Sequence, residues 1–198
     1  MIVELRQYTL RPGRRDDLVD LFDAEFIESQ ERLGMAVLGQ FRDLDRPDRF
    51  VWLRGFADMA VRRRGLQEFY SGPVWTEHGP AANATMLDSD DVLLLREIVP
   101  VPRHEATDGS TLTATIWFRD HPFDAGFTDW FAAQATGAVA VLSTEYAAND
   151  FPALPVREGE HAFVWLARHD DTIEPPSRFG VTAADRLHLS PTARSALR

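Results

Sequence analysis

The sequence predicts an α+β protein that consists of two ferredoxin-like units in tandem. Hydrophobic periodicity gives residues 1–99 the order β-α-β-β-α-β of such a unit. The tetrapeptide Phe-Val-Trp-Leu at residues 50–53 recurs at residues 163–166, and polar turn residues precede both copies. A repeat of this kind indicates an internal duplication. Residues 100–110, which contain two prolines and a glycine, are expected to be a linker, and residues 111–198 a second, degenerate unit.

The first unit begins with a strand in which apolar and polar residues alternate. Gly34 suits the C-cap of the following helix, because glycine adopts the left-handed conformation at little cost. Asp58 suits the N-cap of a second helix, where its carboxylate can accept from a free backbone N–H. The expected elements are, in order, a strand over 2–10, a helix to about residue 33, strands over 35–42 and 49–56, helices over 58–70 and 73–86, and a strand over 92–99.

The second unit repeats this order incompletely. Strands are expected over 112–118, 138–146 and 160–168, with a shorter helix from residue 123 to about residue 136. The end of the chain is first proline-rich and then gives a short apolar piece around Leu187 and Leu189. The second helix of this unit is therefore predicted to be missing or very short.

The repeated strand carries different side chains on its two faces. By the two-residue period, Trp52 and Arg54 share one face with two phenylalanines, whereas Val51 and Leu53 lie on the other. We expect the small aliphatic side chains to pack on helices and the aromatic face to turn toward a second sheet or a cavity. In the second copy, Phe163, Trp165 and His161 would occupy the equivalent aromatic face.

Composition excludes several kinds of chemistry. The chain has 198 residues, 44% of them hydrophobic, and a formal net charge of −10, which argues against nucleic-acid and anionic-membrane partners. All its basic residues apart from histidine are arginine, and it has no cysteine, so Schiff-base lysines, disulfides and thiolate metal sites are excluded. A strand pattern begins at once at the N-terminus, without the layout of a signal peptide, and no apolar run approaches a membrane span. A cytoplasmic location is expected.

The opening decapeptide Glu4-Leu-Arg-Gln-Tyr-Thr-Leu-Arg-Pro-Gly13 resembles that of the NIPSNAP family. The Gly34-Met35 junction, the strand with Trp52 and the position of Trp75 extend the resemblance through the first unit. The tail over residues 187–195 looks like family members with two units, although the rest of the second half is only weakly similar.

This resemblance implies the dimeric α+β barrel, in which two ferredoxin-like sheets face each other around a cavity. Two units in one chain could form that barrel internally, as a pseudo-dimer. Related barrel families include cofactor-independent monooxygenases, haem-handling proteins, and decarboxylating or isomerising enzymes. Analogy of this kind concerns the fold alone.

The first strand supplies the leading candidates for a site. Glu4, Arg6 and Tyr8 share one face and would line the cavity with Trp52 and Arg54 of the neighbouring strand. Arginine offers a fixed fork for an anion, tyrosine a hydrogen-bond donor, and glutamate a proton acceptor. The alternative is a structural ion-pair network, because buried charges are usually paired, with Glu97 or Glu145 as the acidic partner.

His78 is the candidate proton shuttle, since it lies near the expected barrel mouth with Trp75 and Asn83. A lone histidine is more often structural or exposed. The remaining histidines show no paired spacing, so no metal ligands are assigned, and a single axial histidine for haem is kept only as an alternative. The basic run at residues 62–64 is interpreted as a solvated helix face.

These observations predict a protein that binds a small, largely apolar or aromatic metabolite in a barrel cavity, without a cofactor. Phe163 and Trp165 would form its aromatic wall, and the charged groups would come from the first half. Cofactor-independent conversion, of the monooxygenase or isomerase and lyase kind, would be an extension of binding. The competing class is a non-catalytic association or scaffold protein with a filled barrel core. The chain is expected to be a monomeric pseudo-dimer or a homodimer.

Overall fold

A closed barrel of antiparallel strands forms the centre of the molecule. The computed structural model describes residues 1–102, 111–168 and 172–198. Their strands close in the order β1-β3-β2-β8-β5-β7-β6-β4, with β4 pairing back to β1. The strands are β1 (Ile2–Leu10), β2 (Ala36–Asp43), β3 (Arg49–Phe56), β4 (Met86–Val99), β5 (Leu112–Arg119), β6 (Ala138–Thr144), β7 (His161–Ala167) and β8 (Ala183–Pro191).

Each half of the chain supplies four adjacent strands of the barrel. The first half gives the order β4-β1-β3-β2 and the second half the same order with β8-β5-β7-β6. Pairing of β2 with β8 and of β4 with β6 joins the two halves. The two copies of Phe-Val-Trp-Leu lie on β3 and β7, at equivalent places on opposite sides of the ring. Residues 103–110 of the expected linker, including His104, lie outside the described residues, and so does His169.

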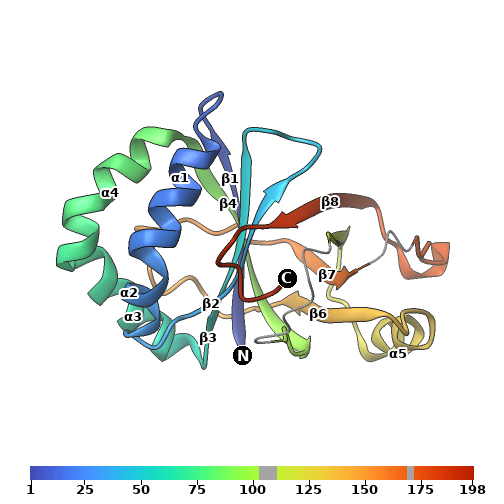
Figure 1. The fold of residues 1–198 in the computed structure, drawn as a ribbon. Helices are drawn as coiled ribbons and strands as arrows, with labels where there is room; N and C mark the ends of the chain where they lie inside the picture. Colours follow the sequence, from blue (N-terminus) through green and yellow to red (C-terminus); the bar gives the residue numbers. More distant parts are fainter. Residues whose placement is uncertain (103–110, 169–171) are drawn as a thin grey trace.

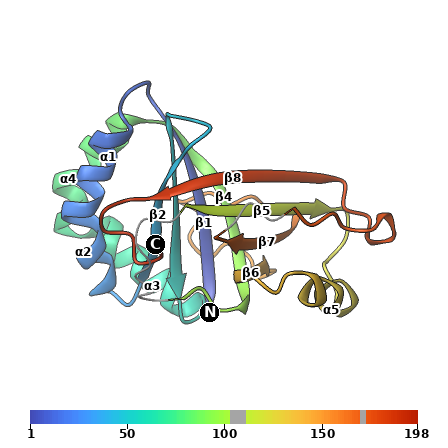
Figure 2. The same ribbon diagram turned by 45° about the vertical axis from the view of Figure 1, so that its right-hand side comes forward.

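Helices cover the outside of the barrel on two sides (Figure 1, Figure 2). The first half places four α-helices and a π-helix on its outer face, whereas the described residues of the second half place one α-helix there. Between β7 and β8 the described residues contain only a short 3₁₀ helix, as the degenerate repeat predicts. The helices are α1 (Arg15–Leu21), the π-helix η1 (Phe22–Phe26), α2 (Ile27–Glu31), α3 (Met59–Ser71), α4 (Pro73–Thr85), α5 (Ala125–Gln134) and the 3₁₀ helix η2 (Ser177–Phe179).

Two of the expected caps are present. Asp58 accepts from the backbone N–H of Val61 at 2.8 Å and so begins α3. Gly34 has φ = +81° just after α2 and turns the chain into β2. Both residues act as their types predict, the first through a side-chain acceptor and the second through left-handed backbone.

Aliphatic side chains fill the barrel interior. The prediction of a cavity between the two sheets is therefore wrong. One buried cluster draws on all eight described strands, including Val51 and Leu53 of β3 with Val164 and Leu166 of β7. Leu197, near the C-terminus, joins the same cluster, and its N–H donates to Leu38 O at 3.0 Å. The aliphatic face of each repeat thus meets the opposite sheet.

The aromatic faces point outward, against the helices, which reverses the expected orientation. Trp52 packs in a cluster with α1 to α4, whereas Phe163 and Trp165 pack around α5. The narrow interior of a closed eight-stranded barrel has room for valine and leucine side chains from every strand. The larger aromatic rings fit between the sheet and the helices outside it. The polar groups of β1 share this outward face.

Candidate functional site

A cleft lined mainly by aromatic side chains lies between the outer face of the first sheet and its helices, and we call it the aromatic cleft. Tyr8 of β1 and Trp52 of β3 form its floor. Its walls are formed by η1 and α2 on one side and by α3 and α4 on the other. The lining residues are Tyr8, Leu18, Phe22, Phe26, Gln30, Trp52, Phe69, Tyr70, Trp75, Ala82 and Met86.

One wall of the cleft is a single stripe along α1, η1 and α2. Leu18, Phe22, Phe26 and Gln30 follow one another at four-residue steps and all line the cleft. In a regular α-helix each such step drifts by about 40° around the axis. The wider turn of the π-helix over Phe22–Phe26 offsets this drift and keeps the stripe on the sheet.

A buried network of charges lies at the sheet side of the cleft. Glu4 is fully buried and binds three guanidiniums. Its Oε2 accepts from Arg6 Nη1 at 2.9 Å and from Arg54 Nη2 at 2.7 Å, and its Oε1 accepts from Arg62 Nε at 2.7 Å. Arg54 Nη1 also donates to Gln30 Oε1 at 3.0 Å. The network therefore reaches the cleft through Gln30.

This network carries an excess of one positive charge. Besides Glu4, its second carboxylate is Asp150, whose Oδ1 lies 2.6 Å from Arg62 Nη1. Among the described residues, three guanidiniums against two carboxylates leave one charge uncompensated. Glu97 and Glu145, the two partners considered from the sequence, instead pair with the N-terminal amine and with Arg96.

The protonation of Glu4 is fixed by its partners. Burial alone would raise its pKa, but the guanidiniums of Arg54, Arg6 and Arg62 outweigh that effect and hold the pKa well below its usual range. Glu4 is therefore a poor proton acceptor at neutral pH, since a general base needs a pKa near the working pH. Its geometry is that of a charge anchor.

Tyr8 and Trp52 present polar hydrogens at the cleft floor. The Tyr8 hydroxyl accepts from Arg6 Nε at 2.9 Å, which leaves its own proton available for donation. Burial raises the pKa of this phenol, so it stays neutral at physiological pH. The buried Trp52 Nε1 has no hydrogen-bond partner among the described residues. Two residues of the cleft floor thus carry polar hydrogens, and the one on Trp52 Nε1 is unpaired among the described residues.

The cleft is nearly closed in this structure. Its free volume is about 20 Å³, roughly the space of one water. Ring packing is tight, as for Phe22 and Trp52, whose centroids lie 4.8 Å apart at 69°. Among its lining residues, Trp75 and Met86 are only partly buried.

His78 and Asn83 lie outside the aromatic cleft. His78 faces Glu25, with its Nε2 at 3.5 Å from Oε2, and its side chain is 27% exposed. Asn83 is exposed and lines a separate surface hollow beside the start of β4. Trp75, from the same helix, does line the cleft. The α-helix explains the division, because residues 75, 78 and 83 do not share one face of a 3.6-residue repeat.

Phe163 and Trp165 are also apart from the cleft. They pack with Trp117, Phe127 and Phe131 in the second half, in a cluster that contains no described charge network like that of Glu4. The second half therefore does not supply the predicted aromatic wall through these two residues.

None of the described histidines, namely His78, His121, His161 and His188, lines the aromatic cleft. Within the described ranges no three histidine, aspartate or glutamate side chains converge as a metal site. The residues of the cleft thus offer no imidazole for an axial haem ligand.

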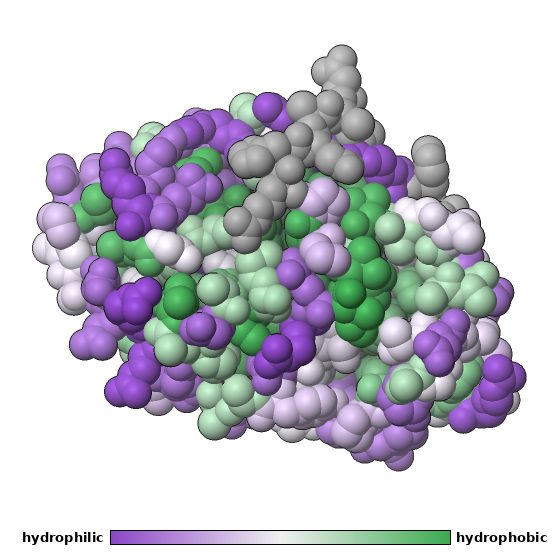
Figure 3. Space-filling model, turned by 90° about the horizontal axis from the view of Figure 1, so that it is seen from below, coloured by the Kyte–Doolittle hydropathy of each residue, from purple (hydrophilic) through white to green (hydrophobic). Residues whose placement is uncertain are grey.

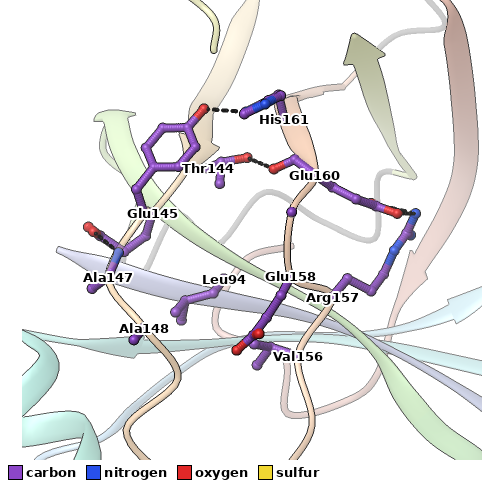
Figure 4. Close-up of a pocket in the computed structure, with 12 residues that line it drawn as sticks. Leu94, Thr144, Glu145, Ala147, Ala148, Val156, Arg157, Glu158, Glu160 and His161 are labelled. Atoms are coloured by element: carbon purple, nitrogen blue, oxygen red, sulfur yellow. Dashed lines mark hydrogen bonds and ion pairs between the residues drawn. The ribbon is translucent and has the colours of Figure 1, made fainter. Parts of the chain in front are cut away.

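A second cavity of about 280 Å³ opens between the ends of β6 and β7 (Figure 4). Its polar groups mostly bind one another. Tyr146 Oη lies 2.9 Å from His161 Nδ1, and Arg157 Nη2 lies 2.7 Å from Glu160 Oε2. Because these groups already bind each other, the aromatic cleft, with its unpaired Trp52 Nε1, is the stronger candidate site.

Several residues of the site escaped prediction. The sequence predicts that Arg62 belongs to a solvated run, but its side chain is buried against Glu4, whereas Arg63 and Arg64 are exposed. Arg62 lies at helical spacing from Leu66 and Phe69, which are both buried. This spacing indicates that Arg62, and not its two neighbours, faces the sheet. Asp150 gave no such signal, because it reaches the site from the other half of the chain.

Fold and site define the class of this protein as an α+β barrel with a buried arginine-rich network beneath an aromatic cleft. Residues 3–98 match the model of the NIPSNAP family, so this half of the chain is a NIPSNAP domain, as its opening motif indicated. No curated protein matches the sequence.

Two solved structures compared with this chain share its fold at low sequence identity. A protein named "putative monooxygenase" from Fusobacterium nucleatum is 7% identical, with a TM-score of 0.64 over 96% of this chain and 91% of its own. One of the same name from Lactobacillus acidophilus is 14% identical, with a TM-score of 0.60 over 96% and 93%. A NIPSNAP family protein from Agrobacterium tumefaciens is 22% identical, with a TM-score of 0.45 over 51% and 98%.

Across the described ranges, no helix combines the length and the apolar character needed to cross a membrane.

Proposed function

We propose that the first half of this protein binds a small aromatic metabolite with one anionic group, such as a carboxylate, phenolate or enolate, in the aromatic cleft. The observation that carries the proposal is the excess positive charge of the buried network beside the cleft, whose floor also holds the unpaired Trp52 Nε1. Buried charges are normally neutralised, so an excess charge in a low-dielectric site favours a ligand of opposite sign.

Each part of the cleft has a role in this proposal. The rings of Phe22, Phe69 and Trp75 would hold an aromatic body by stacking and edge contacts. Tyr8 and Trp52 would donate to the anionic oxygen, and Arg6 would strengthen the Tyr8 donor, since its Nε already binds the phenol oxygen. Glu4 would hold the arginines in place.

The experiment compares two probes of the same ring system and similar size, the anion naphthoate and the neutral naphthalenemethanol, by isothermal titration calorimetry. The proposal predicts that naphthoate binds at least about tenfold more tightly, because a hydrogen bond to a charged group contributes about 1.5–3 kcal/mol. Tyr8→Phe should remove most of this preference while retaining the ring. Equal affinity for both probes, or no binding of either, would contradict the proposal.

Conversion of the ligand would be an extension of this binding. The same charge that holds an enolate or phenolate would favour the ionised form of an enol or phenol, which is the electron-rich form that reacts with O₂. The monooxygenase names of the two proteins with this fold motivate the test. An oxygen electrode with candidate phenols would show protein-dependent consumption of O₂ if the extension holds, and none if the site only binds.

The second candidate function is association with another macromolecule. The filled barrel core favours it, as does apolar surface on the underside of the molecule, where green residues gather between purple margins (Figure 3). Ile98 and Val99, at the end of β4, are 41% and 42% exposed. Dimerisation or capture through this face, with no binding of aromatic anions, would support this function instead.

We also infer that the two halves are a duplicated pair that forms a pseudo-dimer within one chain. The repeated strand order and the equivalent places of the two Phe-Val-Trp-Leu strands support this interpretation. Under it, the first half has kept the site and the second half serves the closure of the barrel.

A further inference from the structure

We propose that residues 145–160, which connect β6 to β7, support a wall of the aromatic cleft from behind and select its ligand by charge and by size. We call this segment the arch. It belongs to the second half of the chain, yet Figure 1 shows it, in orange, reaching toward the helices of the first half. The equivalent connection between β2 and β3 spans only residues 44–48. This inference rests on the proposed function, because it names the residues that select the ligand of the same cleft.

Asp150 of the arch sets the charge of the buried network. Its Oδ1 lies 2.6 Å from Arg62 Nη1, and Asn149 Oδ1 lies 3.1 Å from the same nitrogen. Asn149 Nδ2 in turn donates to Leu154 O at 2.9 Å, which holds the tip of the arch in shape. With Asp150 the network has an excess of one positive charge, and without it the excess would be two.

Phe151 of the arch supports the far wall of the cleft. Its ring stacks on Tyr70 with centroids 6.0 Å apart and an angle of 24°. Tyr70 lines the cleft and meets Trp75 edge-on at 4.7 Å. Phe151 and Leu154 both pack on the cluster that contains the cleft. The position of Tyr70, and with it the size of a ring system the cleft accepts, therefore depends on the arch.

The two legs of the arch are fastened to β4, the neighbour of β1. Glu145 N donates to Leu94 O at 2.9 Å, and Arg157 N donates to Val92 O at 2.9 Å. Arg157 also pairs with Asp91 at 3.1 Å. Figure 4 shows the legs on either side of Leu94. Because Leu94 pairs with Glu4 across the sheet, the arch has a fixed position relative to the charge network.

The test measures binding of naphthoate and naphthalenemethanol to arch variants of the full-length chain. Asp150→Asn should raise the preference for naphthoate over naphthalenemethanol by about fivefold or more, because a second uncompensated charge attracts the anion. Phe151→Ala should weaken the binding of both probes to a similar extent, by about fivefold or more, because the Tyr70 wall loses its support. Phe151→Leu retains an apolar side chain and is used if the alanine variant does not fold. It should weaken the binding of both probes less than Phe151→Ala does.

Glu158→Gln is the matched control, since it removes a carboxylate from an exposed part of the same arch. It should leave both affinities within about twofold, as is usual for exposed substitutions. If the wild type binds naphthoate and the Asp150 and Phe151 variants behave like Glu158→Gln, the arch is packing only and the inference is wrong. A lower preference for naphthoate in Asp150→Asn also overturns it. If the wild type binds neither probe, the proposed function itself fails.

Discussion

At the scale of single residues, Glu4 organises the site because it is the shared partner of three arginines. Removing its charge leaves the guanidiniums of Arg6, Arg54 and Arg62 buried with only Asp150 to balance them. A ligand-free protein tolerates one excess charge in this network, but the loss of Glu4 would raise the excess to two.

Glu4→Gln should therefore lower the free energy of unfolding by about 3–5 kcal/mol, the usual cost of breaking a buried ion pair from one side. Urea denaturation followed by tryptophan fluorescence measures this change. Glu28→Gln is the control, because Glu28 pairs with Arg194 at the surface and should cost no more than about 1 kcal/mol. Equal losses in the two variants would show that the network contributes no more than a surface pair.

The same carboxylate predicts how stability depends on pH. The pKa of Glu4 is lowered in the folded state, so below its unfolded value of about 4.5 the unfolded chain takes up a proton that the folded chain refuses. Its contribution is thus complete above that value and is lost as the pH falls below it. Unfolding measured from pH 6 down to pH 3 should show a steeper loss in wild type than in Glu4→Gln. Parallel curves would contradict this prediction.

The sequence identifies most residues of the charge network, but the prediction that they face the barrel interior is wrong. Period-two alternation correctly put Glu4, Arg6 and Tyr8 on one face with Trp52 and Arg54 opposite them, as the pairing of β1 with β3 shows. Alternation alone does not say which face is inside a barrel, because both faces of these strands are buried. The width of the closed barrel decides it, and width is a property of all the strands together.

At the scale of elements, β2 illustrates how the packed interior constrains a strand. A β-bulge between Val37 and Gly39 shifts its register against β3. A Cβ added at Gly39 would lie 2.5 Å from Phe41 Cζ, so the ring of Phe41 occupies the place of a side chain.

Gly39→Ala should consequently destabilise the protein by about 1–3 kcal/mol, as overpacked cores do. Thermal melting measures the effect. Gly126→Ala in α5 is the matched control, because its nearest contact would be 3.4 Å away and alanine favours helix. A Gly39→Ala protein as stable as wild type would mean that Phe41 moves aside freely and that the interior is not tightly packed.

Element boundaries were largely predictable, because caps and turns are local. Gly34 and Asp58 lie at the ends of helices, and Gly72 separates the two helices expected over 58–70 and 73–86. The strand around Leu187 and Leu189 was underestimated as a short apolar piece, although it pairs with both β2 and β5. Its length depends on partners that are distant in sequence, and a local pattern carries no information about them.

At the scale of the whole molecule, closure of the barrel ties the two halves together. The edges of the first sheet, β2 and β4, pair with β8 and β6 of the second half. The aliphatic face of the first sheet is covered by the second sheet in the same way. Neither feature is available to the first half alone.

Residues 1–99 expressed alone should therefore associate as a homodimer, with a second copy in place of the missing half, since unpaired edges and an exposed apolar face favour association. Size-exclusion chromatography with light scattering reports the mass. A folded, monomeric fragment would contradict the interpretation that the second half serves closure.

The proposed function puts an aromatic anion between the helices and the outer face of the first sheet. A crystal structure of the protein with naphthoate tests this position. We expect the rings among Phe22, Phe69 and Trp75, and the carboxylate within hydrogen-bond distance of the Tyr8 hydroxyl or of Trp52 Nε1. Naphthoate found in the barrel interior or in the cavity beside Tyr146, with the aromatic cleft empty at saturating concentration, would contradict it.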